Sequence, residues 1–79
     1  MITNKDLAYY LALPYPILLV PSDEEEGGWL GKVPDLPGCI TFGETKEEAL
    51  AMIEDARVGW ITHCFEQGNP IPEPQKQKV

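Results

Sequence analysis

The chain has little of what most catalytic and metal-binding sites require. Its 79 residues include one histidine, His63, and two cysteines, Cys39 and Cys64. Two cysteines in an apolar context are too few for a disulfide framework or a zinc site, so buried free thiols are the simpler interpretation. Cys39 has no neighbouring base in the sequence to lower its pKa, and His63 has no second histidine or nucleophile near it. We therefore expect no catalytic residue, no bound metal and no cofactor.

Basic residues are scarce as well, with 6 Lys and Arg against 13 Asp and Glu, for a net charge of −7. This balance opposes direct binding to nucleic acid, which needs clustered positive charge. It favours a basic partner, or only promotes solubility. Long hydrophobic runs are also missing: residues 11–20 are interrupted by Pro14 and Pro16, and no cleavable leader pattern precedes them. We expect a soluble, cytoplasmic protein without a membrane segment.

The length predicts one small domain with a marginal core, because a chain of this size buries only about 60% of its unfolded surface. Residues 1–15 are expected to form an N-terminal arm or short helix, residues 16–74 a single domain, and residues 75–79 a frayed tail. Oligomerisation adds buried area, so we expect a homodimer or a higher homo-oligomer. The candidates for self-association are Tyr9, Tyr10 and Trp60.

Three short runs predict β-strands. Residues 17–20 are apolar and lie between prolines, which indicates a strand buried on both faces or covered on one face by a partner chain. Residues 29–33 and 39–42 flank a tight corner that contains Pro34, Pro37 and Gly38, and Gly38 can take the positive φ that closing such a corner often needs. The links between the three runs are too short for a crossover, so the strands should pair antiparallel.

Residues 45–67 predict the longest element, a helix. Thr45 suits the N-cap and Glu48 falls three residues later, as in a capping box, while Gly68 suits the C-terminal cap. The predicted apolar stripe consists of Ala49, Met52, Ile53, Ala56, Trp60 and Cys64, widened by Leu50, Ile61 and Phe65. A shorter helix within residues 4–13, capped by Asn4 or Asp6, competes with an extended arm. Prolines at every second position in 70–74 predict an extended C-terminal strand along the sheet edge. The expected fold class is α+β, with a three-stranded antiparallel sheet, one long helix packed on it and this short final strand.

The motifs of this chain together resemble the HicB antitoxin family, specifically its N-terminal toxin-binding domain, over about residues 9–74. The resemblance rests on a Tyr-Pro pair before the first strand, a Gly-Gly-Trp after an acidic loop, a Pro-Asp-Leu-Pro-Gly-Cys corner and a Gly-Glu-Thr entry into the helix. The motif residues with a structural role are Pro34, Asp35, Leu36, Pro37, Gly38, Cys39, Thr45 and Glu48.

The resemblance implies a truncated RNase H-like fold of order β-β-β-α-β and a non-enzymatic function. Members bind a small basic HicA toxin that cleaves RNA and cover its active site, as part of a type II toxin-antitoxin system. Many also carry a C-terminal DNA-binding module. This chain ends at Val79 without one, so we expect no direct DNA binding from it. The expected partner-binding residues are Asp23, Glu24, Glu25, Glu26, Trp29 and Asp35.

Several alternatives remain open. The acids at 23–26 are either a solvated hairpin tip or a docking patch for a basic toxin. Trp29 is either core or an interface anchor. The chain could also be an orphan oligomeric domain with a structural or regulatory role and no toxin. A residual metal-dependent nuclease is disfavoured, because the three strand runs contain no Asp or Glu to converge on metal ions.

Overall fold

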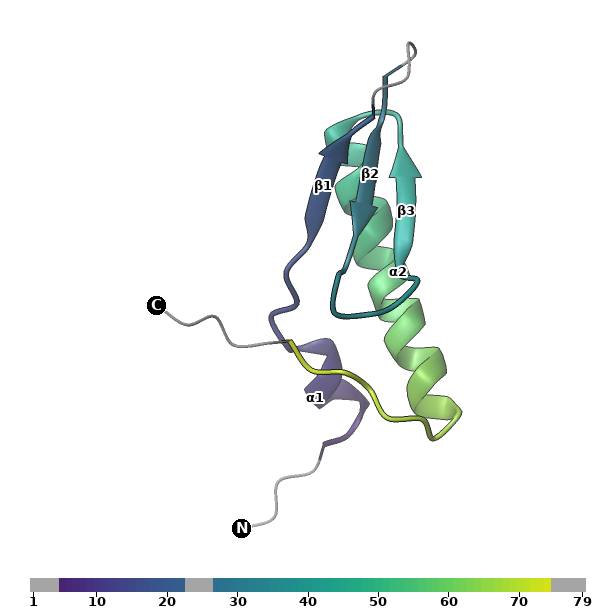
Figure 1. Cartoon of the computed structure of the whole chain (residues 1–79). Coiled ribbons are helices and arrows are strands. Elements are labelled where there is room, and N and C mark those ends of the chain that lie inside the picture. The colour runs from purple at the N-terminus through teal and green to yellow at the C-terminus, as the bar shows by residue number, and fades with distance from the viewer. Residues whose placement is uncertain (1–4, 23–26, 75–79) are drawn as a thin grey trace.

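The computed structural model describes residues 5–22 and 27–74. Asn4, the acidic run from Asp23 to Glu26 and the predicted tail at 75–79 lie outside the described residues, so the predictions made for them stay predictions. The elements follow the order α1 (Leu7–Leu11), β1 (Leu18–Pro21), β2 (Trp29–Lys32), β3 (Ile40–Gly43) and α2 (Lys46–Glu66) (Figure 1). The predicted α+β fold, with a three-stranded sheet and one long helix, is confirmed.

The sheet is an antiparallel meander with β2 in the middle. Its register places Leu19, Gly31 and Thr41 in one row, and Val20, Leu30 and Phe42 in the next. Successive side chains of a strand point to opposite faces, so these two rows lie on opposite sides of the sheet. The first side is covered by α2, which crosses behind the strands in Figure 1, and the second is the open face.

Two glycines let α2 lie close to the sheet. A Cβ on Gly43 of β3 would stand 2.5 Å from the backbone nitrogen of Ala49 and 2.8 Å from its Cα. A Cβ on Gly31 of β2 would stand 3.1 Å from the Cβ of Ile53. The first turns of α2 therefore contact the backbone of the sheet directly, which needs residues without side chains at these two positions.

Both caps of α2 form close to where the sequence predicts them. The Glu48 N–H donates to Thr45 Oγ1 at 3.0 Å, while Glu48 Oε1 accepts from the N–H of Glu44 at 2.6 Å, one residue earlier than in the usual capping box. At the other end Gly68 has φ +74°, and the Asn69 N–H donates to the carbonyl of Cys64. This bond and the left-handed glycine are the Schellman termination.

The core lies between α2, the sheet and the corner that joins β2 to β3. Its most deeply buried side chains are Leu36, Ile53, Ile61 and Val33. The predicted helix stripe is shifted: Met52 is 42% exposed, whereas Ile61 is fully buried. Trp60 is half-buried, and its Nε1–H donates to the carbonyl of Pro37. The stripe therefore faces the corner and the first strand as well as the sheet centre.

The two ends of the described chain meet beside the start of β1 (Figure 1). Asp6 caps α1 by accepting from the Tyr9 N–H at 3.0 Å, so the helix alternative is the correct one for this segment. Residues 69–74 are extended, as expected, but they pair with no described strand. Prolines at 70, 72 and 74 offer no N–H to a ladder. The segment is held instead by the burial of Ile71 in the core and by the Tyr15 hydroxyl, which donates to the carbonyl of Pro72.

Of the two alternatives for residues 17–20, burial on both faces within the chain is wrong, and cover of one face by a partner chain stays a prediction. Leu18 and Val20 are 44% and 37% exposed on the open face, while Ile17 and Leu19 are half-buried on the helix side. The apolar run therefore has one covered face and one uncovered face, because no second layer of this chain packs on the open side of the described sheet.

Candidate partner-binding surfaces

The structure does not bring the described partner-binding residues of the prediction together. Trp29 begins β2 and Asp35 lies in the corner beyond its other end, about 20 Å along the chain at strand spacing. Trp29 is half-buried, with Lys46 Nζ 5.8 Å from the centre of its ring. Asp35 is also half-buried. Trp29 therefore combines the two alternatives: it lies on the helix side of the sheet and keeps an accessible edge.

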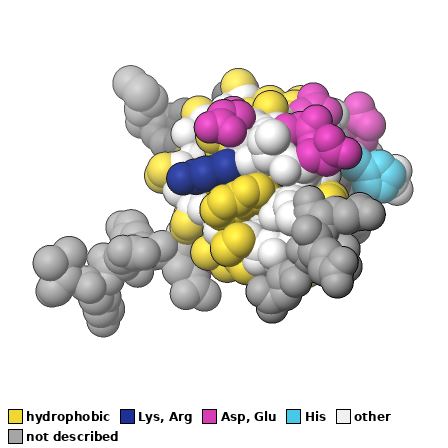
Figure 2. All heavy atoms as spheres, turned by 90° about the horizontal axis from the view of Figure 1, so that it is seen from above, with side chains coloured by type: hydrophobic (Ala, Val, Ile, Leu, Met, Phe, Trp, Pro, Cys, Tyr) yellow, Lys and Arg dark blue, Asp and Glu magenta, His cyan; other side chains and the backbone are white. Residues whose placement is uncertain are grey.

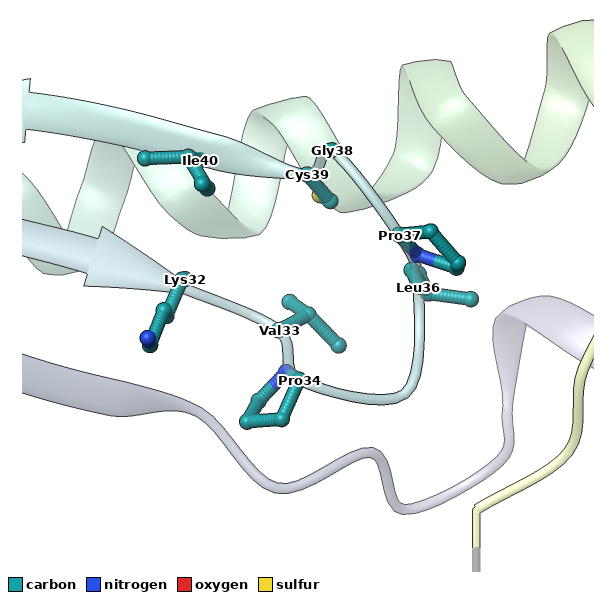
Figure 3. Close-up of a pocket in the computed structure, with 8 residues that line it drawn as sticks. All are labelled: Lys32, Val33, Pro34, Leu36, Pro37, Gly38, Cys39 and Ile40. Atoms are coloured by element: carbon teal, nitrogen blue, oxygen red, sulfur yellow. The ribbon is translucent and has the colours of Figure 1, made fainter.

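The Pro-Asp-Leu-Pro-Gly-Cys corner forms a small open hollow (Figure 3). Its volume is about 240 Å³. Backbone bonds close it: Val33 N–H donates to Cys39, Leu36 N–H to Val33, and Cys39 N–H to Leu36. Gly38 takes φ +82°, as the sequence predicts. The hollow is lined by Lys32, Val33, Pro34, Leu36, Pro37, Gly38, Cys39 and Ile40. Leu36 and Cys39 are buried here. The motif therefore fills part of the core, and its more exposed residues form a shallow apolar rim.

The open face of the sheet is an exposed apolar surface. Ile40 and Phe42 of β3 are 53% and 48% exposed, and Leu18 and Val20 of β1 complete the surface across β2. The ring of Phe42 lies against Gly28, where an added Cβ would stand within 3.0 Å of it. Apolar patches of this kind on small proteins mark interaction surfaces more often than isolated exposed side chains do.

The two edges of the sheet differ in the backbone groups that they offer. In antiparallel pairs, hydrogen-bonded partners alternate with partners that make no main-chain bond. The Ser22 N–H donates to Gly28, which continues the β1–β2 register, so Val20 and Leu18 also bond inward to β2. The outward groups of the β1 edge therefore belong to Leu19 and Pro21, and Pro21 has no N–H to offer.

The edge formed by β3 offers complete outward groups. The Val33 N–H donates to Cys39, which continues the β2–β3 register, so Thr41 and Gly43 bond inward to β2. Ile40 and Phe42 consequently direct both their N–H and C=O groups away from the sheet. No proline lies within β3, and the next outward N–H, that of Glu44, is already bound to Glu48.

Thr41, between these two residues, holds an unusual polar atom. Among the described residues, its Oγ1 is buried and has no hydrogen-bond partner. Burying a hydroxyl without a partner costs about 1–3 kcal/mol, so such an atom normally has a reason. The hydroxyl belongs to an edge strand, where a further strand would lie next to it.

The outer face of α2 combines acidic and apolar side chains. Leu50, Val58 and Phe65 are 39–41% exposed on it. The exposed acidic residues of the helix are Glu47, Glu48, Glu54, Asp55 and Glu66. Figure 2 shows Asp and Glu side chains gathered along the upper rim of the end-on view, next to exposed hydrophobic ones. We call Leu50, Glu54, Asp55 and Val58 the outer helix patch. An acidic rim around apolar side chains suits a basic partner.

The three side chains predicted for self-association make contacts within the chain. Tyr9 and Tyr10 form an edge-to-face pair with ring centres 5.1 Å apart, and the Tyr9 hydroxyl donates to Glu73. Glu73 also pairs with Lys5 at 3.3 Å. Trp60 is bonded to the corner, as described above. These residues join the two ends of the domain, and their role in self-association stays a prediction.

The thiols and acids of the described residues offer little for catalysis. Burial raises the pKa of the Cys39 thiol, with Arg57 acting weakly in the opposite direction, so the thiol is protonated at neutral pH. Cys64 is buried, with its sulfur 3.4 Å from the carbonyl oxygen of Pro70. Within residues 5–22 and 27–74, no three His, Cys, Asp or Glu side chains form a group that could hold a metal ion. None of the helices in this part of the chain could cross a membrane.

Comparison with known proteins now places the chain in a family. Residues 15–78 match the HicB-like antitoxin family of bacterial toxin-antitoxin systems. Two relatives from Photorhabdus laumondii, named Antitoxin HicB 2 and Antitoxin HicB 1, are 42% and 43% identical over 60 residues, which is 76% of this chain. The chain spans about two-fifths of the length of these two relatives, 41% and 37%.

A shorter relative matches almost from end to end. The UPF0150 protein Ta0767 of Thermoplasma acidophilum is 31% identical over 67 residues, which cover 85% of this chain and 94% of that protein. No solved structure gives a significant match. The family match covers the sheet, the corner and α2, which are the elements that carry the surfaces described above. The chain belongs to the HicB-like antitoxin family.

Proposed function

We propose that this chain is a non-catalytic antitoxin domain that binds and blocks a HicA-type RNA-cleaving toxin. The observation that carries the proposal is the family match over residues 15–78, which spans nearly the whole described domain. The net charge of −7 on this chain supports the same conclusion. A toxin that cleaves RNA presents a basic surface to the RNA, and an acidic protein can bind to that surface. An acidic domain seated on that surface would keep RNA away from the catalytic group.

The outer helix patch is the best-supported surface for this contact. Val58 and Leu50 give it apolar side chains to desolvate, and Glu54 and Asp55 give it a negative rim. The acids at 23–26, which link β1 to β2 in the sequence, would add long-range attraction for a basic toxin. This attraction speeds the encounter at low salt. The block is steric, and it requires no reactive group from the antitoxin.

The direct test is co-expression with the product of the neighbouring gene, if that gene encodes a small basic protein with a lone histidine. We expect the two proteins to co-purify, and the chain to prevent RNA cleavage by the toxin in a purified assay. Failure to co-purify, together with undiminished RNA cleavage, would contradict the proposal.

A matched pair of variants locates the surface. Val58→Lys puts a positive charge into the outer helix patch and should lower toxin affinity by at least about tenfold, since it adds like charge to a basic interface. Leu18→Lys changes a side chain of similar exposure on the open sheet face and should leave affinity unchanged.

Replacing Asp23, Glu24, Glu25 and Glu26 by Ser should slow association and flatten its salt dependence. Unchanged association kinetics would remove the loop from the interface.

The orphan alternative keeps one specific observation in its favour. The chain aligns with 94% of the Ta0767 protein, whose name assigns it no toxin and no function. If no basic neighbour exists, and the purified chain binds no HicA-type toxin, the domain serves a structural or regulatory role. We place this second because the matches to proteins named Antitoxin HicB have higher identity, 42% and 43% against 31%.

A further inference from the structure

We propose that the three tyrosines of this chain form a binding site for extended, proline-containing peptides, and that residues 70–74 of the chain itself occupy this site in the structure. The tyrosine site comprises Tyr9 and Tyr10 of α1 and Tyr15, which precedes β1. Its ligand on another protein would be a segment of the same chemistry, an aliphatic residue between two prolines followed by a carboxylate. The site uses no residue of the outer helix patch and does not depend on the toxin.

Residues 70–74 have the properties of a bound peptide. Prolines at every second position keep the backbone extended and offer no N–H to a ladder, and the segment pairs with no described strand. It leaves α2 through Gly68 and passes beside α1 in Figure 1. Domains that bind proline-rich peptides recognise this extended backbone with aromatic side chains, which the three tyrosines supply here.

One aliphatic side chain anchors the segment. Ile71 is 9% exposed and lies in the core cluster with Tyr15, and Tyr10 packs against the same cluster. Pro70 and Pro72 on either side of it are exposed. A strand with one covered face would bury every second residue, and Glu73 is exposed as well. The segment is therefore held at one position, as a docked peptide is.

The carbonyl groups of the two prolines beside the anchor have partners. The Tyr15 hydroxyl donates to the carbonyl of Pro72, and the Cys64 sulfur lies 3.4 Å from the carbonyl oxygen of Pro70. A proline has no N–H, so its carbonyl is the one main-chain group by which it can be recognised. The site therefore contacts the backbone of the segment as well as its anchor.

The N-terminal residues recognise the carboxylate that follows. Lys5 Nζ lies 3.3 Å from Glu73 Oε2, and the Tyr9 hydroxyl donates to Oε1 at 3.2 Å. Lys5 Nζ also lies 5.8 Å from the centre of the Tyr9 ring. Each carboxylate oxygen thus has its own partner. The ion pair is exposed and contributes little affinity, so its role is to select an acidic ligand.

The helix that supplies two of the tyrosines is not part of the matched family domain. The family match begins at residue 15, after α1 has ended. None of the residues of α1 is buried, so the helix closes little of the core. Arg57 nevertheless fixes it against α2 by donating to the carbonyl of Leu11 at 3.1 Å. A binding role explains this added helix better than a contribution to stability does.

The bound segment can be exchanged, because neither the sheet nor α2 is built on it. The three strands pair with each other, and the Schellman termination of α2 is complete at Asn69. A segment with one buried side chain opens at a lower free energy than the core does. Its tether gives it an effective concentration in the millimolar range, so it competes with ligands from other proteins.

The direct test is a titration with the synthetic peptide Asn-Pro-Ile-Pro-Glu-Pro, the sequence of residues 69–74, followed by NMR of the isotope-labelled chain. Ile71→Ser removes the anchor of the tethered segment and therefore its competition. We expect the peptide to bind this variant at least about tenfold more tightly than the unsubstituted chain, and to shift the signals of residues 9–15. A folded variant whose signals do not respond to the peptide would overturn the proposal.

A second variant decides the question if Ile71→Ser fails to fold. Glu73→Lys leaves the core intact and places a like charge beside Lys5, so it loosens the tethered segment through its exposed contacts. The free peptide keeps its own carboxylate and should bind this variant a few-fold more tightly than the unsubstituted chain. Circular dichroism confirms that the variant is folded. An unchanged affinity in the folded Glu73→Lys variant would contradict exchange at this site.

Altered peptides test the recognition of the anchor and of the carboxylate. With serine in place of the isoleucine, the peptide should lose measurable binding, and equal affinity of the two peptides would overturn the proposal. Tyr9→Phe should weaken binding of the original peptide by a few-fold and leave unchanged the binding of a peptide with alanine in place of the glutamate. An equal loss for both peptides would assign Tyr9 a structural role and remove carboxylate recognition from the proposal.

Discussion

The two edge strands of the sheet have similar length and similar exposed apolar side chains, yet they offer different backbone groups to another strand. On β1 the outward positions are Leu19 and Pro21, and Pro21 has no N–H. On β3 the outward positions are Ile40 and Phe42, which both direct an N–H and a C=O away from β2. Proline at an outward position weakens the β1 edge for pairing, as is common in natural sheets.

The difference shows that exposure alone does not define a docking edge. Leu18 and Val20 are almost as exposed as the side chains of β3. Composition alone would therefore predict that both edges bind another strand. What separates them is the direction of each residue's backbone groups, which the register with β2 decides. Proline at an inward position would have broken the sheet, and proline at an outward position protects it.

The edges also differ in how tightly the helix holds them. The N-terminal turn of α2 lies on Gly43 of β3 and on Gly31 of β2, with no side chain between the backbones. Tyr15 and Ile71 join the core beyond the start of β1, and α1 packs there against α2 and not against the strand. The β3 edge is therefore the one that the helix backbone approaches most closely.

The largest effect should come from filling the contact between β3 and α2. Gly43→Ala places a Cβ 2.5 Å from a backbone nitrogen that no side-chain rotation can move, so the helix must shift away from the strand. We expect a loss of about 3 kcal/mol in the free energy of unfolding, at the upper end of the usual range for overpacking of a buried site. Urea denaturation followed by circular dichroism measures it.

Two other glycines provide the comparison for this variant. Gly68→Ala tests the left-handed backbone alone, because φ is +74° and nothing lies within 4 Å; we expect about 1–2 kcal/mol. Gly31→Ala meets the Cβ of Ile53 at 3.1 Å and the carbonyl oxygen of Ala49 at 3.2 Å, which are less severe contacts than the 2.5 Å one at Gly43, so its cost should lie below that of Gly43→Ala. A cost at Gly43 no larger than at Gly68 would mean that the helix does not depend on this contact.

Much of the fold was predictable because its signals are local. The caps of α2 at Thr45 and Gly68, the three strands to within one residue, and the left-handed Gly38 all follow from residues that are neighbours in sequence. The burial of Leu36, Tyr15 and Ile71 was not predicted, since it depends on segments that meet only in three dimensions. The C-terminal segment is held by the buried Ile71, by hydrogen bonds from two tyrosines and by the Lys5–Glu73 pair, and no local pattern distinguishes that from a strand.

The candidate surfaces were predicted less well, for a related reason. Charge and aromaticity pointed to Asp35 and Trp29, which lie at opposite ends of β2. The β3 edge has neither, and it was visible only once the register showed which groups face outward. The buried hydroxyl of Thr41 has no sequence signal, since threonine is common in strands whether or not its hydroxyl has a partner.

A smaller effect, of the opposite sign, tests the buried hydroxyl of Thr41. Thr41→Val replaces a buried hydroxyl by a methyl group of similar size. In the single chain this removes an unsatisfied polar atom, so the free energy of unfolding should rise by about 1 kcal/mol. Urea denaturation followed by circular dichroism measures this change.

The sign of the change decides the state of the hydroxyl. A less stable variant would show that the hydroxyl has a partner within its own domain. Ile40→Val, which shortens an exposed side chain of the same strand without touching a polar atom, controls for loss of apolar contact.

The smallest effect concerns pH, where each edge strand is preceded by a buried weak acid. Burial raises the pKa of Cys39, before β3, and that of Tyr15, before β1, above their ordinary values of 9.0 and 10.0. The unfolded chain therefore releases these protons at lower pH than the folded chain. The stability that they contribute is complete below pH 9 and is lost as pH rises through the folded pKa values. We expect the urea midpoint to fall above pH 9. Cys39→Ala and Tyr15→Phe should each flatten part of this fall, and a midpoint that falls equally in the double variant would assign the loss to other groups.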